Sequence, residues 1–350
     1  MRNLAFRGLR LPRLGAMRAG GFSPASLFAG GQQGALLEAF DIDTLFQLSD
    51  GTTPVTVATN PIGYAGDKSG NANHAIQAIT ARRLTYQTGP ARMVLDKVDD
   101  SLIMTVPAGG FTGTMVLATD QGTASYGVTI PVGAYDIGGR DGQYFPGTAI
   151  VGQLIRDGAL SVGESAAVEA YFVANGATAS YGAVTTFLTF WRGMAELTSF
   201  PLIDTSSGNN FQQAWYGCSS LTSFPLIDTS SGTNFYQTWR NCSSITSFPL
   251  IDTSSGTNFE RAWYGCSSLT SFPANVFDNV TVGQFTNAFI NTALTQTSID
   301  NILVSLVASG IAAGTRVFDQ SGGSAPSATG EAAITTLRSR GWTVTVTGGF

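Results

Sequence analysis

The stretch LTSFPLIDTSSGNNFQQAWYGCSS spans residues 197–220, and near-copies of it begin at residues 221, 245 and 269. The fourth copy, LTSFPANVFDNVTVGQFTNAFINT, has diverged but keeps the start and the length. A fixed spacing of 24 residues is typical of stacked repeats, in which each unit buries its apolar side against the next. The spacing therefore predicts a repeat solenoid over residues 177–292.

Each repeat contains the signals for a strand, a turn and a return segment. Leu197, Phe200 and Leu202 have the spacing of a short parallel strand whose apolar side chains point inward. The Asp204–Gly208 run has the composition of a turn. Phe211 and Trp215 are four residues apart, which places both on one face of a short helix. We expect an α/β leucine-rich-repeat solenoid.

Three cysteines and three aspartates recur in the same slots of successive repeats. Cys218, Cys242 and Cys266 suggest either a metal or redox cluster or a row of buried thiols, and their separation favours buried thiols because metal motifs pair ligands within one loop. The aspartates suggest either calcium binding or turn capping, and the turn composition favours capping. We expect no metal and no cofactor. The aspartates are Asp204, Asp228 and Asp252.

The first three repeats differ mainly around the return segment, beside Phe211 and Trp215. Such variation indicates either tuning for a ligand or an exposed surface with little constraint. Aromatic and arginine side chains are enriched at binding hot spots. The predicted receptor contacts are therefore Tyr216, Tyr236, Arg240, Arg261 and Tyr264. The alternative contacts lie on the polar strand face and are Thr198, Ser199, Thr222, Ser223, Thr246 and Ser247.

The repeats resemble the BspA-like leucine-rich repeats of bacterial surface proteins. The resemblance rests on the Leu197-Thr198-Ser199 start, the Asp204-Thr205-Ser206 turn and the Gly217-Cys218-Ser219-Ser220 end. It covers about 100 residues and implies an adhesin-type module without enzyme activity. Pro201 and its equivalents depart from the family pattern, and a proline cannot donate a hydrogen bond to a neighbouring strand.

Composition narrows the functional classes. The chain has 350 residues, a net charge of −5 and 12% charged residues, and its only lysines are Lys68 and Lys97. Nucleic acid and anionic membranes require basic patches, so neither is an expected partner. We expect no membrane insertion and no export signal, so the predicted route out of the cell is assembly into a virion that is released by lysis.

Residues 1–34 are predicted to form an arm that docks on an acidic virion partner. This segment is basic and partly hydrophobic, with leucines between the arginines and no acidic residue before Glu38. A targeting peptide or a segment without structure would look similar. The proposed docking residues are Arg2, Arg7, Arg10, Arg13 and Arg18.

Residues 35–176 are predicted to form an abridged β-sandwich that ends in a helix capped by Ser161 and Glu164. The motifs at residues 44–47, 67–75, 95–100 and 157–171 resemble a laminin-G or concanavalin-like jelly roll of the type found in phage tail proteins. His74 lies in the second motif, where we expect it to stabilise a turn. The expected strands are Arg92–Leu95, Leu102–Val106, Thr114–Ala118, Gly127–Ile130 and Ala149–Arg156.

Residues 293–350 alternate helix and strand patterns, with helices expected at 297–309 and 332–340. Such an α/β segment would cap the last repeat. Its start at Thr297-Ser298-Ile299-Asp300 and its end at Arg340-Gly341-Trp342 are similar to the tails of repeat-bearing phage fibre proteins.

Together, these patterns predict a bacteriophage virion protein: a tail fibre or spike subunit that attaches to a host-surface glycan or protein. It would lie in the virion tail, contact other tail or baseplate proteins and be extracellular after lysis. A homotrimer is expected by analogy. The alternatives are a head or baseplate decoration protein without a receptor role, or a bacterial adhesin. A glycan-processing enzyme is disfavoured because no pair of converging carboxylates is evident.

Overall fold

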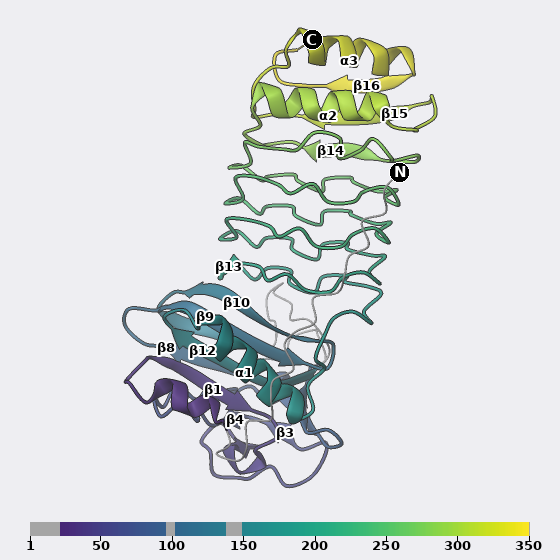
Figure 1. The fold of residues 1–350 in the computed structure, drawn as a ribbon. Coiled ribbons are helices and arrows are strands. Elements are labelled where there is room, and N and C mark those ends of the chain that lie inside the picture. The colour runs from purple at the N-terminus through teal and green to yellow at the C-terminus, as the bar shows by residue number, and fades with distance from the viewer. Residues whose placement is uncertain (1–21, 96–101, 138–148, 350) are drawn as a thin grey trace.

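The computed structural model describes residues 22–95, 102–137 and 149–349. Two antiparallel sheets lie at the N-terminal end, and the repeats extend from the larger sheet toward a C-terminal α/β segment (Figure 1). The larger sheet has the order β13 (Leu197–Ser199), β10 (Thr123–Ile130), β9 (Phe111–Thr119), β12 (Ala149–Asp157), β7 (Arg92–Val94), β6 (Leu84–Gln87) and β3 (Pro61–Ile62), and β1 (Gly34–Glu38) also pairs with β12.

The smaller sheet packs against one face of the larger sheet. Its apolar residues, among them Met104, share one buried cluster with Met115 and Tyr126 of the larger sheet. Helix α1 (Val162–Ala174) covers the opposite face, where Val168 and Phe172 are fully buried. The smaller sheet has the order β11 (Gly133–Ile137), β8 (Leu102–Val106), β5 (Ala75–Ile76), β4 (Tyr64–Ala65) and β2 (Leu45–Phe46).

Several local predictions for this region are confirmed. Strand β8 has the expected bounds, and β9, β10 and β12 contain the expected strands with one to four additional residues. Ser161 and Glu164 form the predicted capping box at the start of α1, since each side chain bonds to the backbone of the other residue. Three short 3₁₀ helices, η1 (Pro24–Phe28), η2 (Ile42–Thr44) and η3 (Thr80–Arg82), lie in the connections.

The predicted fold class is wrong. The structure is mostly β, with three sheets that are mainly antiparallel, and its described part has only three α-helices, none of them in the repeats. The expected α/β leucine-rich-repeat solenoid requires a parallel strand and a return helix in each unit. The only regular strand in the first three repeats is β13, and it pairs antiparallel with β10.

Each repeat instead forms one coil made of turns and extended loops. Single parallel bridges connect successive coils, as at Asn210–Asn234 and Asn234–Asn258. Two residues in each return segment have positive φ, for example Gln213 at 55° and Gly217 at 76°. Because a left-handed residue interrupts the helical hydrogen-bond pattern, two of them four residues apart replace the predicted helix by consecutive turns.

The C-terminal segment is a three-stranded parallel sheet with the order β14 (Phe285–Phe289), β15 (Arg316–Gln320) and β16 (Trp342–Thr345). Helices α2 (Gln296–Ala308) and α3 (Ala328–Ser339) connect these strands and agree with the two predicted helices. No helix in the described ranges has the length and apolar character needed to cross a bilayer.

Candidate binding surface

The interior of the coils consists of ladders of identical side chains. Trp215 stacks on Trp191 at 5.1 Å and on Trp239 at 5.9 Å between ring centroids, with nearly parallel planes. Phe211 and Phe235 form a parallel ladder beside them at 5.5 Å. These spacings show that equivalent positions on the surface recur about every 5 Å along the stack, which is close to the separation of adjacent strands.

The three cysteines lie within this interior. Cys218, Cys242 and Cys266 are free, and each thiol donates a hydrogen bond of 3.0–3.1 Å to the carbonyl oxygen of the tryptophan in the preceding coil. Burial raises the pKa of all three thiols, to about 12 for Cys266. The prediction of a row of buried thiols is confirmed, because each thiol is protonated, packed and hydrogen-bonded.

Three of the five predicted receptor contacts form one ladder on the outside of the coils. The Arg240 guanidinium lies between two aromatic rings, 5.4 Å from the centroid of Tyr216 and 4.8 Å from that of Tyr264. Arg192 extends the ladder on the other side of Tyr216, at 5.0 Å. We call Arg192, Tyr216, Arg240 and Tyr264 the Arg–Tyr ladder. Its side chains are half-buried, so the rings hold the two cations in fixed positions.

Arg240 has no charge partner among the residues that the structure describes. No carboxylate there forms an ion pair with its guanidinium, and its buried Nε atom has no hydrogen-bond acceptor. A half-buried cation without a counter-ion retains an unsatisfied preference for an anionic oxygen. Arg192 was not among the predicted contacts, although it precedes Tyr216 by 24 residues and could have been found by extending the repeat toward the N-terminus.

The other two predicted contacts belong to an adjoining polar ladder. The Tyr236 hydroxyl accepts a hydrogen bond of 3.0 Å from Gln237, whose side-chain oxygen accepts one of 2.7 Å from Gln213. Arg261 lies 3.8 Å from the carboxylate of Glu260. Because Tyr236 and Arg261 are already paired, they are less available to a ligand than the Arg–Tyr ladder.

The alternative strand-face contacts are placed on a different side of the coils. Thr222, Ser223, Thr246 and Ser247 are exposed, and the Thr222 hydroxyl donates to the Thr198 carbonyl oxygen at 3.2 Å. Ser199 accepts a hydrogen bond of 3.1 Å from the backbone of Gly127 in β10. The first repeat therefore uses this face partly for contact with the larger sheet.

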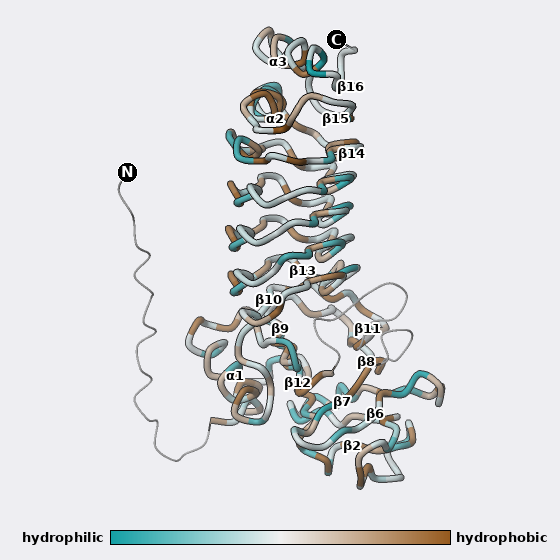
Figure 2. The backbone as a smooth tube through the Cα atoms, turned by 90° about the vertical axis from the view of Figure 1, so that its right-hand side faces the viewer, coloured by the Kyte–Doolittle hydropathy of each residue, from teal (hydrophilic) through white to brown (hydrophobic). Residues whose placement is uncertain are grey.

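A third row of side chains was not predicted. Leu202, Leu226 and Leu250 expose 73%, 61% and 53% of their surface, whereas Leu202 was expected to point inward. The reason is local: in the second and third repeats the isoleucine after the leucine donates to the carbonyl oxygen of the preceding proline at 3.0 Å. This tight turn directs Ile227 inward and Leu226 outward. Figure 2 shows hydrophobic segments recurring at one edge of successive coils.

An exposed aspartate follows each of these leucines by two residues. Asp204 and Asp228 each accept hydrogen bonds from the backbone and the hydroxyl of the serine two residues on, and Asp252 accepts from the backbone of Ser254. The predicted turn capping is confirmed. We call the row formed by Leu202, Leu226, Leu250, Asp204, Asp228 and Asp252 the Leu–Asp stripe.

A hollow lies at each end of the Leu–Asp stripe. The first, of about 310 Å³, is lined by Leu202 and Asp204 together with Ser125 and Glu169 from the sheet and α1. The second, of about 400 Å³, is lined by Leu250, Asp252 and residues of the fourth repeat. The stripe is therefore a row of exposed leucines and aspartates with a hollow at each end.

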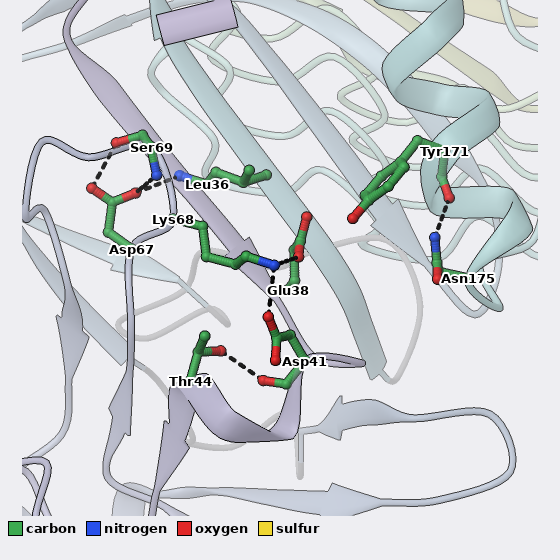
Figure 3. Close-up of polar contacts among 9 residues, drawn as sticks. All are labelled: Leu36, Glu38, Asp41, Thr44, Asp67, Lys68, Ser69, Tyr171 and Asn175. Atoms are coloured by element: carbon green, nitrogen blue, oxygen red, sulfur yellow. Dashed lines mark hydrogen bonds and ion pairs between the residues drawn. The ribbon is translucent and has the colours of Figure 1, made fainter. Parts of the chain in front are cut away.

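An ionic cluster joins the end of β1 and the loop after it to the loop that follows β4 (Figure 3). Lys68 Nζ is 2.6 Å from a carboxylate oxygen of Glu38 and 2.6 Å from one of Asp41, and Glu38 is buried. Burial lowers the pKa of Lys68, but its hydrogen bonds to the two carboxylates outweigh this and raise it overall. Burial and the negative charge of Glu38 raise the pKa of Tyr171 to about 12. One ammonium group bridges two carboxylates, so the buried Glu38 has a counter-ion, which indicates a structural role.

His74 also has a structural role, as predicted. Its Nδ1 atom accepts a hydrogen bond of 2.9 Å from the backbone of Asp67. The Asp67 carboxylate in turn accepts from the backbone of Leu36, Ser69 and Asn73 at 2.8–2.9 Å. These bonds fix the 67–75 turn against β1. Within the described ranges, no group of three or more His, Cys, Asp or Glu residues is arranged to hold a metal ion.

A buried carboxylic acid lies where the coils meet the larger sheet. Glu196 is 6% exposed and accepts a hydrogen bond of 3.2 Å from the Tyr135 hydroxyl. Burial raises the pKa of Glu196 above its usual value, because desolvation disfavours the charged form. Its ionisation therefore opposes the packing of the first coil on the sheet.

We expect Glu196→Gln to stabilise the protein at pH 8 and to have little effect at pH 4. The folded-state pKa is raised, so the native protein holds the proton more tightly, and stability falls as the pH rises from the unfolded pKa through the folded one. Glutamine cannot ionise and still accepts from Tyr135. Urea unfolding at the two pH values measures the difference, and an equal effect at both would contradict it.

The predicted docking residues Arg2, Arg7, Arg10, Arg13 and Arg18 lie outside the described residues. No family model, no curated protein and no solved structure matches the chain.

Proposed function

We propose that this protein is a virion attachment protein, a tail fibre or spike subunit, that binds an acidic glycan on the host surface through the Arg–Tyr ladder. The observation that carries the proposal is the Arg240 guanidinium, held between Tyr216 and Tyr264 with no carboxylate partner among the described residues. Carboxylate, sulfate and phosphate groups are the natural ligands of such a cation.

The repetition of the ladder supports a repetitive ligand. Arg192 and Arg240 are two coils apart, which corresponds to roughly 10 Å at the strand-like spacing of the coils. A polymer with regularly spaced acid groups matches this recurrence, and its successive groups reach Arg240 at a high effective concentration. The rings are fixed before binding, so little side-chain entropy is lost on association. The virion assignment itself is supported by the sequence resemblances to phage fibre and tail proteins.

Binding to a glycan array tests the ligand. We expect Arg240→Gln to reduce binding to acidic glycans by about 30-fold, the loss of a hot-spot contact of about 2 kcal/mol, and high salt to reduce it further. The matched control is Thr222→Ala with Thr246→Ala on the strand face, which should bind normally. If the control loses binding and Arg240→Gln does not, the alternative strand face is the binding site.

The position of the protein in assembled particles tests the virion assignment. Antibody labelling of purified particles should mark the tail. Labelling of the head or baseplate, combined with no glycan binding, would favour a decoration protein without a receptor role. Absence from particles would reject the virion assignment, and glycan binding would then indicate a bacterial adhesin. The expected homotrimer is measured separately, by light scattering of the purified chain.

A further inference from the structure

The Leu–Asp stripe combines exposed apolar side chains with negative charges that have no counter-ion among the described residues. Its leucines are more than half exposed, and rows of exposed apolar side chains mark interaction sites. Its aspartates bind backbone and hydroxyl groups only, so their negative charge is not balanced by a cation among the described residues. A matching partner would combine apolar side chains with positive charge.

We propose that, in the isolated chain, residues 1–21 dock along the Leu–Asp stripe of the same molecule, with their arginines against the aspartates and their leucines against the exposed leucines. The composition of the segment matches the stripe, since it alternates basic and apolar residues and has no acidic residue. The matching residues are Arg2, Arg7, Arg10, Arg13 and Arg18 and Leu4, Phe6, Leu9, Leu11 and Leu14. This inference does not depend on the attachment function.

The segment joins the described structure close to one end of the stripe. Phe22 packs against Tyr171 of α1, with 6.5 Å between the ring centroids. Glu169, in the same helix, lines the first hollow together with Leu202 and Asp204. Residue 22 therefore lies about one helix diameter, ~10–12 Å, from the end of the stripe formed by Leu202 and Asp204.

The length of the segment is sufficient. An extended chain of 21 residues reaches roughly 70 Å. Leu202 and Leu250 are separated by two coil spacings, or roughly 10 Å. Residues 1–21 can therefore pass the first hollow, follow the stripe and reach the second hollow at Asp252 without straining the chain.

The first hollow is suited to a guanidinium group. It places the carboxylates of Glu169 and Asp204 in one cavity with the hydroxyl of Ser125, which donates 2.6 Å to Glu169. An arginine there would face two acidic groups at the point where the segment first meets the repeats. Charge-assisted bonds of this kind are shorter and stronger than neutral ones.

Disulfide trapping in the full-length chain tests the docking. The native cysteines are buried, so new ones can be paired without interference. We expect Gly8→Cys with Ser231→Cys, beside the stripe, to form a disulfide within one chain. The control is Gly8→Cys with Ser267→Cys, which is exposed and half a repeat away from the slot of Ser231; it should not cross-link. Equal cross-linking of both pairs, or none of the first, would overturn the proposal, and a link only between chains would assign the stripe to a second copy.

Limited trypsin digestion tests the contribution of charge. We expect cleavage after Arg7, Arg10 and Arg13 to be about tenfold faster when the three aspartates of the stripe are changed to asparagine, which keeps the capping oxygen and removes the charge. High salt should accelerate cleavage of the wild type in the same way. Asp43→Asn, at an exposed aspartate near β2, is the control and should cleave at the wild-type rate. Identical rates of trypsin cleavage in the wild type and the triple variant would contradict the proposal.

Discussion

Replacing Trp239 by alanine should destabilise the protein by about 3–5 kcal/mol, which is the usual cost of removing a large buried aromatic side chain. Trp239 has no exposed surface and stacks on Trp215 at 5.9 Å and on Trp263 at 5.3 Å. It also contacts Phe248 edge to face at 4.8 Å. Because each coil packs on its two neighbours, the cavity would weaken both interfaces. Chemical denaturation followed by circular dichroism measures the loss.

Two phenylalanine substitutions separate ring packing from hydrogen bonding. In the described residues no acceptor is within reach of Trp239 Nε1, so Trp239→Phe removes an unsatisfied donor and loses only packing. Trp191 Nε1, in contrast, donates to the Tyr126 hydroxyl at 3.1 Å. We expect Trp191→Phe to cost about 1 kcal/mol more than Trp239→Phe. Equal costs would show that this hydrogen bond contributes nothing.

Replacing Lys68 by methionine should cost about 2–4 kcal/mol, because it leaves the buried Glu38 carboxylate without its cation. Lys68 bonds Glu38 and Asp41 at 2.6 Å each (Figure 3). The Lys68 side chain is about one-third exposed, at 32%, so solvent screens part of the interaction and the cost falls below that of a fully buried pair. Thermal unfolding at neutral pH and low salt measures it.

The double variant Lys68→Met with Glu38→Gln provides the control. Removing both charges leaves no uncompensated carboxylate at the Glu38 position, so the double variant should be more stable than Lys68→Met alone. Arg156→Met serves as a comparison, since its Nε donates to a backbone carbonyl and not to a carboxylate. If the double variant were the least stable of the three, the cluster would contribute through packing and not through charge compensation.

The sequence predicted some of the residues of the candidate binding surface. Variation among near-identical repeats indicated Tyr216, Arg240 and Tyr264, and the structure brings these three into one ladder. It separates them from Tyr236 and Arg261, which share the same repeats but lie in neighbouring slots with their own partners. The repeat length is enough to assign each residue its position within a repeat. Which side chains at neighbouring positions touch each other depends on how the backbone of the coil bends, and the repeat length does not contain that information.

The sequence by itself determined the repeat length, the buried rows of tryptophan, phenylalanine and cysteine, the capping of α1 and the two C-terminal helices, because these depend on local patterns of apolar and capping residues. Only the tertiary structure decided that the return segment is a series of turns and that Leu202 points outward. The physical reason is that stacking forces the backbone of each coil to follow the one before it. At Gln213 and its equivalents this requirement imposes a left-handed conformation that no local preference predicts.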